Sequence, residues 1–222
     1  MMIGPESYYD IHIKGKSIKQ IEKEINKLRK EITKLKYRIE KPCEIEEMVV
    51  RCPSDDVILS CKRDYLERAI QALKDAGGTY KPSEEEKKDR EFNKNIPFIK
   101  KIEYSVTGYN IKDDKKIVVL IDDEGIEIYK EFMFLPENND RDIDEDMPID
   151  KEYWLESLKN LHIGEWLDVY DPIRFGITVL DGYQWEVNFY FSNGYETKTI
   201  TGINDEPYNF CEFLELLNCT EF

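Results

Sequence analysis

The sequence predicts an α+β protein in which a long N-terminal helix precedes an antiparallel sheet. Three observations indicate this fold class. An apolar heptad repeat runs through residues 18–39, apolar and polar residues alternate in several segments after residue 96, and turn signals separate those segments. We therefore expect two parts. Residues 1–95 form a helical arm or helical hairpin with a short N-terminal strand, and residues 96–222 form an α+β domain with an antiparallel sheet.

The helical arm is organised around a coiled-coil-like helix that begins after Ser17 and ends before Pro42. Ser17 is a suitable N-cap, and Pro42 disfavours helical geometry at the residue before it. Isoleucine occupies every a position of the heptad, and leucine occupies most of the d positions. This pattern is typical of a parallel, two-helix coiled coil. The resulting apolar seam consists of Ile18, Ile21, Ile25, Leu28, Ile32, Leu35 and Ile39.

Charges beside the seam fit a homodimer, but a second helix of the same chain fits as well. In a parallel dimer Glu24 would face Arg29 of the partner, and Glu31 would face Lys36, so that both pairs have opposite signs. The segment 61–76 offers an apolar stripe that would cover the same seam within one chain. That stripe consists of Leu66, Ala69, Ile70 and Leu73. The sequence leaves both arrangements open.

The residues before this helix predict a short strand and not a nucleotide-binding loop. Tyr9, Ile11 and Ile13 alternate with polar residues, as in a strand with one buried face. Residues 15–17 read Gly-Lys-Ser and precede a helix, as in a phosphate-binding loop. That motif requires a glycine where Asp10 stands, and an aspartate there would repel phosphate.

Two further helices complete the expected N-terminal part. The helix 61–76 ends at Gly77 and Gly78, which favour helix termination. Ser83 and Glu86 form a capping-box pattern that starts a short, highly charged helix. Because that helix is so polar, we expect an exposed connector. The boundary between the two parts is expected at about residue 96, where the periodicity changes from helical to strand-like.

The C-terminal part reads twice as a hairpin, a loop and a helix. The apolar run 117–121, a turn at 123–125 and the segment 126–134 predict the first hairpin, and Asp150 caps the helix that follows. The second hairpin contains the alternating segment 185–191, which is followed by an Asn-Gly turn signal and a last helix capped by an asparagine. The turn is Asn193-Gly194, the cap is Asn209, and Glu212 stands at the capping-box position.

Composition and charge exclude some classes of protein. The net charge is −15, yet residues 18–41 carry +5 and residues 136–222 carry −15, so a basic helix is joined to an acidic body. No stretch of about 20 apolar residues spans a membrane, and the N-terminus lacks the apolar core of a signal peptide. The five cysteines show no paired spacing and are expected to be reduced thiols. We therefore expect a cytoplasmic protein without a membrane partner.

The best metal candidate in the sequence is an acidic loop. Asp140, Asp142, Asp144 and Asp146 have the alternate spacing of a calcium loop, but Glu145 and Lys151 replace the glycine and glutamate that an EF-hand requires. Weak calcium binding is thus the only cofactor expectation. Neither His12 nor His162 belongs to a catalytic motif, and His162 suits the C-terminal end of a helix. No catalytic residue is predicted.

Residues 181–217 contain a succession of short motifs. Asp-Gly-Tyr-Gln-Trp is followed by a strand, an Asn-Gly turn, a second strand, Thr-Gly-Ile-Asn, a proline, Asn-Phe and a leucine-rich helix. This succession resembles a module that recurs in uncharacterised bacterial proteins, although Tyr183 and Thr201 depart from its pattern. The resemblance implies a structural module over about one sixth of the chain and brings no activity with it.

These observations favour a non-enzymatic protein-interaction module of bacterial or phage origin, which self-associates through residues 18–39 or binds another protein. One alternative is an acidic inhibitor, of the anti-defence or nucleic-acid-mimic type, that occupies a basic site on a nucleic-acid-binding protein. Another is a metal-dependent enzyme that uses the carboxylates of residues 140–146. Direct binding of nucleic acid is disfavoured because the chain is strongly acidic.

Overall fold

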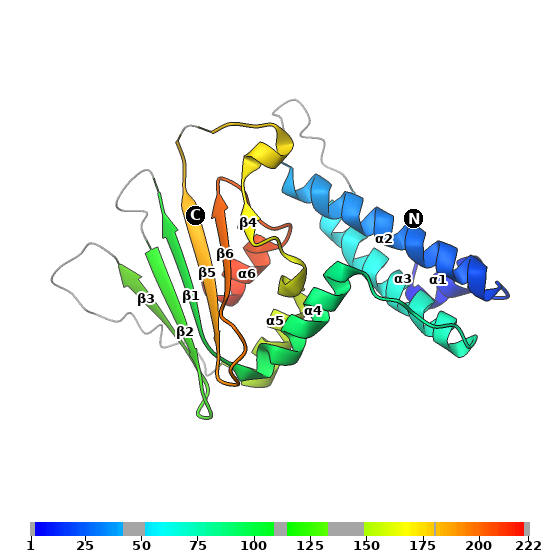
Figure 1. The fold of residues 1–222 in the computed structure, drawn as a ribbon, viewed down its shortest axis with the longest axis horizontal. Coiled ribbons are helices and arrows are strands. Elements are labelled where there is room, and N and C mark those ends of the chain that lie inside the picture. The colour runs from blue at the N-terminus through cyan, green and yellow to red at the C-terminus, as the bar shows by residue number, and fades with distance from the viewer. Residues whose placement is uncertain (1–2, 42–51, 109–114, 133–148, 180, 220–222) are drawn as a thin grey trace. The chain divides into compact units, whose positions relative to one another are not determined.

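The computed structural model describes residues 3–41, 52–108, 115–132, 149–179 and 181–219. The chain divides into two compact units, Met1–Pro82 and Ser83–Phe222. The first is helical and the second combines helices with a six-stranded sheet, so the α+β prediction is confirmed (Figure 1). The predicted calcium loop at residues 140–146 lies outside the described residues.

The helical unit contains α1 (Pro5–His12), α2 (Ile18–Glu40) and α3 (Asp55–Asp75). The strand predicted at residues 9–13 is wrong, since most of this segment belongs to α1. Pro5 in the first turn favours helix initiation because its backbone is already constrained to a helical φ angle. Ile11 is 65% exposed whereas Ile13 is buried, so burial does not follow the two-residue alternation that suggested a strand.

The apolar seam of α2 is covered by helices of the same chain. Ile21, Ile25 and Leu28 join one core with Tyr8 of α1 and Leu73 of α3. Farther along α2, Ile32 and Leu35 are also buried, while Ile18 at the start of the helix is 38% exposed. Of the two arrangements left open by the sequence, the structure shows the intrachain one.

The charged residues beside the seam are also engaged within the chain. Glu31 forms an ion pair with Lys62 of α3, with 2.7 Å between Oε2 and Nζ. The Arg29 guanidinium donates to the Tyr80 hydroxyl at 2.8 Å and to the Lys81 carbonyl oxygen. The pairing of Glu24 and Glu31 with a second copy, expected for a homodimer, is therefore replaced by contacts inside the helical unit.

The second unit is built around a sheet with the order β3-β2-β1-β5-β6-β4 (Figure 1). All neighbouring strands are antiparallel except β4 and β6, which are parallel. The strands are β1 (Ile99–Thr107), β2 (Lys115–Ile121), β3 (Ile126–Phe132), β4 (Val169–Tyr170), β5 (Gln184–Phe191) and β6 (Lys198–Ile203).

Three helices supply the other half of the core of this unit. They are α4 (Glu84–Asn95), α5 (Lys151–Asn160) and α6 (Phe210–Leu216), with short 3-10 turns at Ile96–Phe98, Ile163–Glu165 and Pro172–Phe175. Phe92, Leu158 and Phe213 from the three helices belong to the same core as the inward side chains of β1, β2, β5 and β6. The helices therefore cover one face of the sheet.

The boundary between the units is at Pro82 and not near residue 95. The sequence suggested that the charged helix α4 is an exposed connector, and this prediction is wrong. Phe92 is only 1% exposed and meets Phe189 edge-to-face, with 5.2 Å between ring centroids. Phe92 is thus an apolar anchor on an otherwise polar helix, and burying one phenylalanine contributes about 1.5–3 kcal/mol.

Both predicted hairpins are present, and the cap of the last helix differs. The register of β5 and β6 is centred on Asn193-Gly194, and β2 pairs with β3 through the turn at 122–125.

Asn209 precedes α6 but makes no side-chain cap bond. Its amide oxygen instead accepts from Trp166 Nε1 at 2.9 Å, and its amide nitrogen donates to the Leu161 carbonyl oxygen. Buried polar groups need such partners, and this need outweighs capping here.

Within the described residues, no helix combines the length and the apolar character needed to cross a bilayer.

Candidate functional site

The outward side of α2 carries a row of lysines, opposite the buried seam. Its five lysines recur at steps of three or four residues, so they lie on one side of the helix, and all are exposed. We call this row the lysine face, and it consists of Lys19, Lys23, Lys27, Lys30 and Lys34. A groove of about 860 Å³ runs along α2, and its lining includes the lysine face, Lys16 and the interspersed Glu22 and Glu31.

One carboxylate at the edge of the lysine face is held in place by the fold. The Tyr8 hydroxyl donates to Glu24 Oε1 at 2.7 Å, and Lys27 donates to the same oxygen at 3.2 Å. Burial acts to raise the pKa of Glu24, but these hydrogen bonds and the nearby lysines outweigh burial and lower it. Glu24 is therefore a fixed anion that compensates Lys27 and, at 3.9 Å, Lys16.

The two units differ sharply in charge. Residues 1–82 contain seventeen Lys and Arg and fourteen Asp and Glu, a net charge of +3. Residues 83–222 contain fifteen against thirty-three, a net charge of −18. The lysine face is thus a local cationic surface on a protein whose other unit is strongly anionic. An anionic partner is therefore attracted to α2 and repelled by the second unit.

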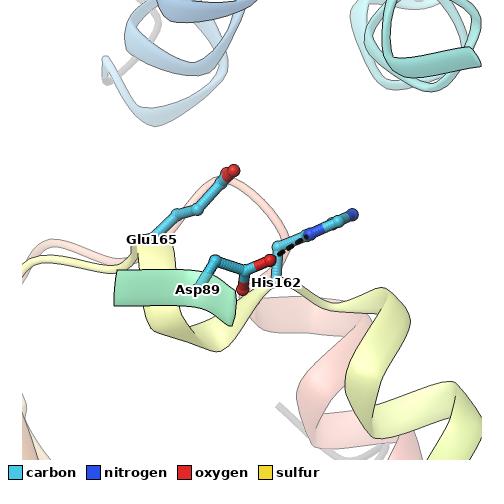
Figure 2. A group of neighbouring side chains, drawn as sticks. All are labelled: Asp89, His162 and Glu165. Atoms are coloured by element: carbon cyan, nitrogen blue, oxygen red, sulfur yellow. Dashed lines mark hydrogen bonds and ion pairs between the residues drawn. The ribbon is translucent and has the colours of Figure 1, made fainter. Parts of the chain in front are cut away.

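In the second unit, Asp89, His162 and Glu165 bring three potential metal-ligand atoms together, all within 4.8 Å of one another (Figure 2). Asp89 lies on α4, whereas His162 immediately precedes the 3-10 turn after α5 and Glu165 is its last residue. His162 Nδ1 lies 2.9 Å from Asp89 Oδ2. Asn93, one turn farther along α4, donates to the same Asp89 oxygen at 3.0 Å.

The backbone at Gly164 allows this group to form. A Cβ atom built on Gly164 would lie 2.3 Å from the Asp89 Cα atom, so any larger residue would separate the turn from α4. His162 has a left-handed backbone conformation with φ 52°, which directs the chain into the turn. The close approach of turn and helix places His162 and Glu165 beside Asp89.

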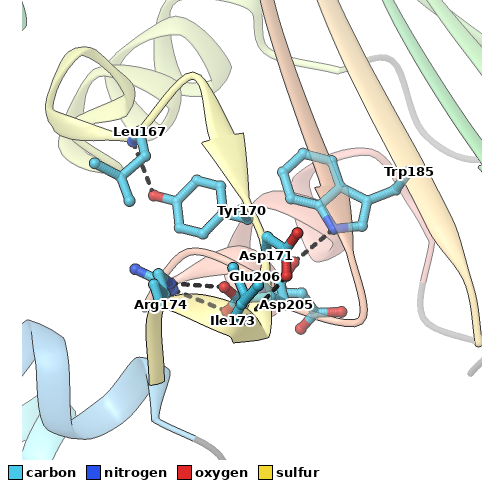
Figure 3. Close-up of polar contacts among 8 residues, drawn as sticks. All are labelled: Leu167, Tyr170, Asp171, Ile173, Arg174, Trp185, Asp205 and Glu206. Atoms are coloured by element: carbon cyan, nitrogen blue, oxygen red, sulfur yellow. Dashed lines mark hydrogen bonds and ion pairs between the residues drawn. The ribbon is translucent and has the colours of Figure 1, made fainter. Parts of the chain in front are cut away.

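A second polar cluster joins the β4 region to the segment 204–206 (Figure 3). The Arg174 guanidinium binds both oxygens of buried Asp205, at 2.6 and 2.8 Å, and lies over the Tyr170 ring. Trp185 Nε1 donates to the Asp205 carbonyl oxygen at 2.9 Å. Every one of these groups has a partner inside the cluster, which indicates a structural role.

The motif-rich segment 181–217 contributes to the same cluster. The Asn204 amide oxygen accepts the Tyr183 N–H at 3.0 Å, so Asn204 ties two turns together. The Tyr183 hydroxyl donates to Glu206 Oε1 at 2.5 Å. Burial raises the pKa of the Glu206 carboxyl, although the hydrogen bond from Tyr183 opposes that shift. These contacts account for the conspicuous residues of the segment without a ligand.

The structure does not bring the predicted site residues together in one place. Most of the seam is buried inside the helical unit, so those side chains are not presented to a partner. Asp140, Asp142, Asp144 and Asp146 lie outside the described residues. His162 follows α5, as expected, but pairs with Asp89, which the sequence did not single out. Asp89 is 73 residues away and lies on a helix whose polarity suggested exposure, so no local signal linked the two.

Comparisons with protein-family models, with curated proteins and with solved structures find no match.

Proposed function

We propose that this protein is a non-enzymatic protein-interaction module whose lysine face binds an acidic surface of another protein. The observation that carries this proposal is the exposed row of five lysines on α2. The apolar seam is occupied by α1 and α3, so the outward side of the same helix is the part of α2 available for binding. Lysine side chains on a rigid helix offer charges at fixed spacing, which favours recognition of a matching anionic surface.

The pattern of charges favours a protein partner over nucleic acid. Glu22 and Glu31 lie among the lysines in the groove, and the second unit carries −18. A duplex presents one phosphate charge per about 1.7 Å, and such a dense and uniform anion is repelled by both features. An acidic protein surface has separate carboxylates and contains cations of its own, which can pair with the interspersed glutamates.

Binding to a defined polyanion tests this proposal. Fluorescence anisotropy with labelled poly-L-glutamate at low salt is expected to show binding that weakens steeply as salt is added, because the contacts are screened charges. The triple variant Lys23→Gln, Lys30→Gln, Lys34→Gln should lose at least tenfold in affinity. Glutamine keeps a high helix propensity, so α2 is expected to stay folded.

A matched variant shows whether position or total charge matters. Lys94→Gln, Lys100→Gln and Lys159→Gln together remove the same charge from exposed positions in the other unit. This control should bind poly-L-glutamate at least as well as the unaltered protein. Equal affinity of the lysine-face variant and this control, or tighter binding of a DNA duplex than of poly-L-glutamate, contradicts the proposal.

The charge of the second unit supports one alternative, an acidic inhibitor that occupies a basic site on a partner. Residues 83–222 carry −18, and many of the described carboxylates are exposed. This alternative predicts that labelled poly-L-lysine binds with equal affinity to the unaltered protein and to the lysine-face variant. Absence of poly-L-lysine binding at low salt contradicts it.

We place the protein in the cytoplasm. Cys52, Cys61, Cys211 and Cys219 are not joined in disulfides in the described part of the chain. Free thiols persist in reducing compartments, where disulfides are rare. Isolation under denaturing conditions in the presence of a thiol-blocking reagent should label these four positions, because unfolding makes the buried Cys219 accessible. Recovery of any of them as a native disulfide contradicts the cytoplasmic assignment.

A further inference from the structure

We propose that Asp89, His162 and Glu165 form a binding site for a divalent transition-metal ion. The site lies within the second unit and is independent of the lysine face. It uses one imidazole nitrogen and two carboxylates, drawn from α4 and from the turn after α5.

The spacing of the three ligand atoms suits a metal ion after a small adjustment. The atoms lie within 4.8 Å of one another. Around a tetrahedral zinc ion with bonds of about 2.0–2.1 Å, neighbouring ligand atoms are about 3.3 Å apart. The required closure is of the order of an ångström. Glu165 is half-buried and ends a short turn, so a rotation of its side chain supplies this movement.

Asp89 provides an independent observation that points to a ligand. Its side chain is only 9% exposed. Oδ2 meets His162 and Asn93, but Oδ1 has no hydrogen-bond partner among the described residues. A buried carboxylate oxygen without a partner is unfavourable, because it has lost its hydrogen bonds to water and gained none in return. The unpaired Oδ1 belongs to the same carboxylate as Oδ2, so an ion bound by that carboxylate would give it a partner.

The surroundings hold the ligands in place. Asn93 donates to Asp89 Oδ2 from the next turn of α4, an orienting contact of the kind that supports metal-bound carboxylates. The contact between Gly164 and the α4 backbone fixes the turn that carries the other two ligands. Packing of the α4 backbone against the turn therefore fixes the positions of Asp89 on one side and of His162 and Glu165 on the other.

The ligand set selects the class of ion. Imidazole favours zinc and other late transition metals, and carboxylates extend the range to manganese. Calcium and magnesium prefer all-oxygen ligands, so His162 disfavours them. Three protein ligands leave at least one coordination position for water or for a group of a bound molecule.

Isothermal titration calorimetry of the full-length chain with Zn²⁺ and, separately, with Mn²⁺ tests the proposal. We expect one ion of either metal per chain. Mn²⁺ is included because thiolates select softer metals, so the cysteines do not account for its binding. Glu165→Gln and His162→Asn should each weaken binding at least tenfold. Asparagine tolerates the left-handed conformation of residue 162, and glutamine matches the size of the half-buried Glu165, so at least the Glu165 variant is expected to fold.

Two controls separate this site from others in the chain. His12→Asn alters the only other histidine, and Asp142→Asn with Asp144→Asn alters the acidic loop. Both controls should bind as the unaltered protein does. If neither Zn²⁺ nor Mn²⁺ binds, the proposal is overturned. It is also overturned by binding that persists in folded Glu165→Gln, as checked by circular dichroism, or by binding that is lost in the acidic-loop variant.

Discussion

Gly164 shows how a single residue decides the geometry of a site. The Asp89 Cα atom would lie 2.3 Å from a Cβ at this position, and the neighbouring atoms belong to the rigid backbone of α4. We expect Gly164→Ala to lower the free energy of unfolding by about 2 kcal/mol or more, as overpacking typically does. Urea unfolding followed by circular dichroism measures this loss. Gly4→Ala, where a Cβ has open space, should cost less than about 1 kcal/mol, because the only expected loss is that of glycine as the N-cap of α1. Similar losses at the two positions argue against the close contact.

Glu103 of β1 gives the clearest pH prediction. The Tyr190 hydroxyl donates to it at 2.6 Å, and Lys101 and Lys116 each lie 3.2 Å away, so its pKa falls from 4.5 to about 2. Because the folded-state pKa is lowered, the stabilisation is present above about pH 4.5 and is lost as the pH falls towards 2.

Glu103→Gln should therefore reduce the free energy of unfolding at pH 7 by about 1 kcal/mol, the scale of one hydrogen bond to a charged group at a partly exposed site. Urea unfolding at pH 7, 4.5 and 2.5 should show this difference shrinking as the pH falls. A difference that is constant across this range contradicts the assigned role of the carboxylate.

At this scale, local signals in the sequence were reliable and distant pairings were not. The Ser83 hydroxyl accepts the Glu86 N–H, and the Asp150 carboxylate accepts the Tyr153 N–H, as their capping patterns predicted. Asn209 had the same kind of local signal, but burial beside Trp166 recruited its side chain for a distant contact. The Asp89–His162 pair was missed because nothing near either residue in the sequence points to the other.

The element that best illustrates the limits of pattern analysis is α2. Its heptad repeat predicted the buried side of the helix, since Ile21, Ile25, Leu28, Ile32 and Leu35 are all buried. The repeat could not identify the covering helix, because a seam has the same spacing whether its partner lies in the same chain or in another. For α1, the two-residue alternation was misleading because a short segment with few apolar residues fits both periods.

Packing of α2 leads to a prediction for its central leucine. Leu28 is completely buried in the core of the helical unit, so Leu28→Ala should cost about 2–5 kcal/mol of stability. Ile18, at the start of the same seam, is 38% exposed, and Ile18→Ala should cost less than about 1 kcal/mol. Urea unfolding of both variants measures the contrast. Equal costs would mean that the seam is covered along its whole length or not at all.

For the whole molecule, the sequence predicted the hairpins but not their assembly. The segments 115–132 and 184–203 contain their own strand and turn signals. The position of β1 between β2 and β5, and the parallel pairing of β4 with β6, depend on contacts between segments far apart in the chain. The polar composition of α4 suggested an exposed connector, yet this helix contributes Phe92 to the core of the second unit, which begins at Ser83.

The central claim is that the seam of α2 is occupied within the chain, which leaves the lysine face for partners. Sedimentation velocity at micromolar to 100 micromolar concentration tests it most directly, in low salt and in about 0.5 M salt, where charge contacts are strongly screened. We predict a single species of 26.4 kDa in high salt, because the apolar seam is not available to a second copy. A species of twice that mass that persists in high salt, and that dissociates in Leu28→Ala, would contradict the account.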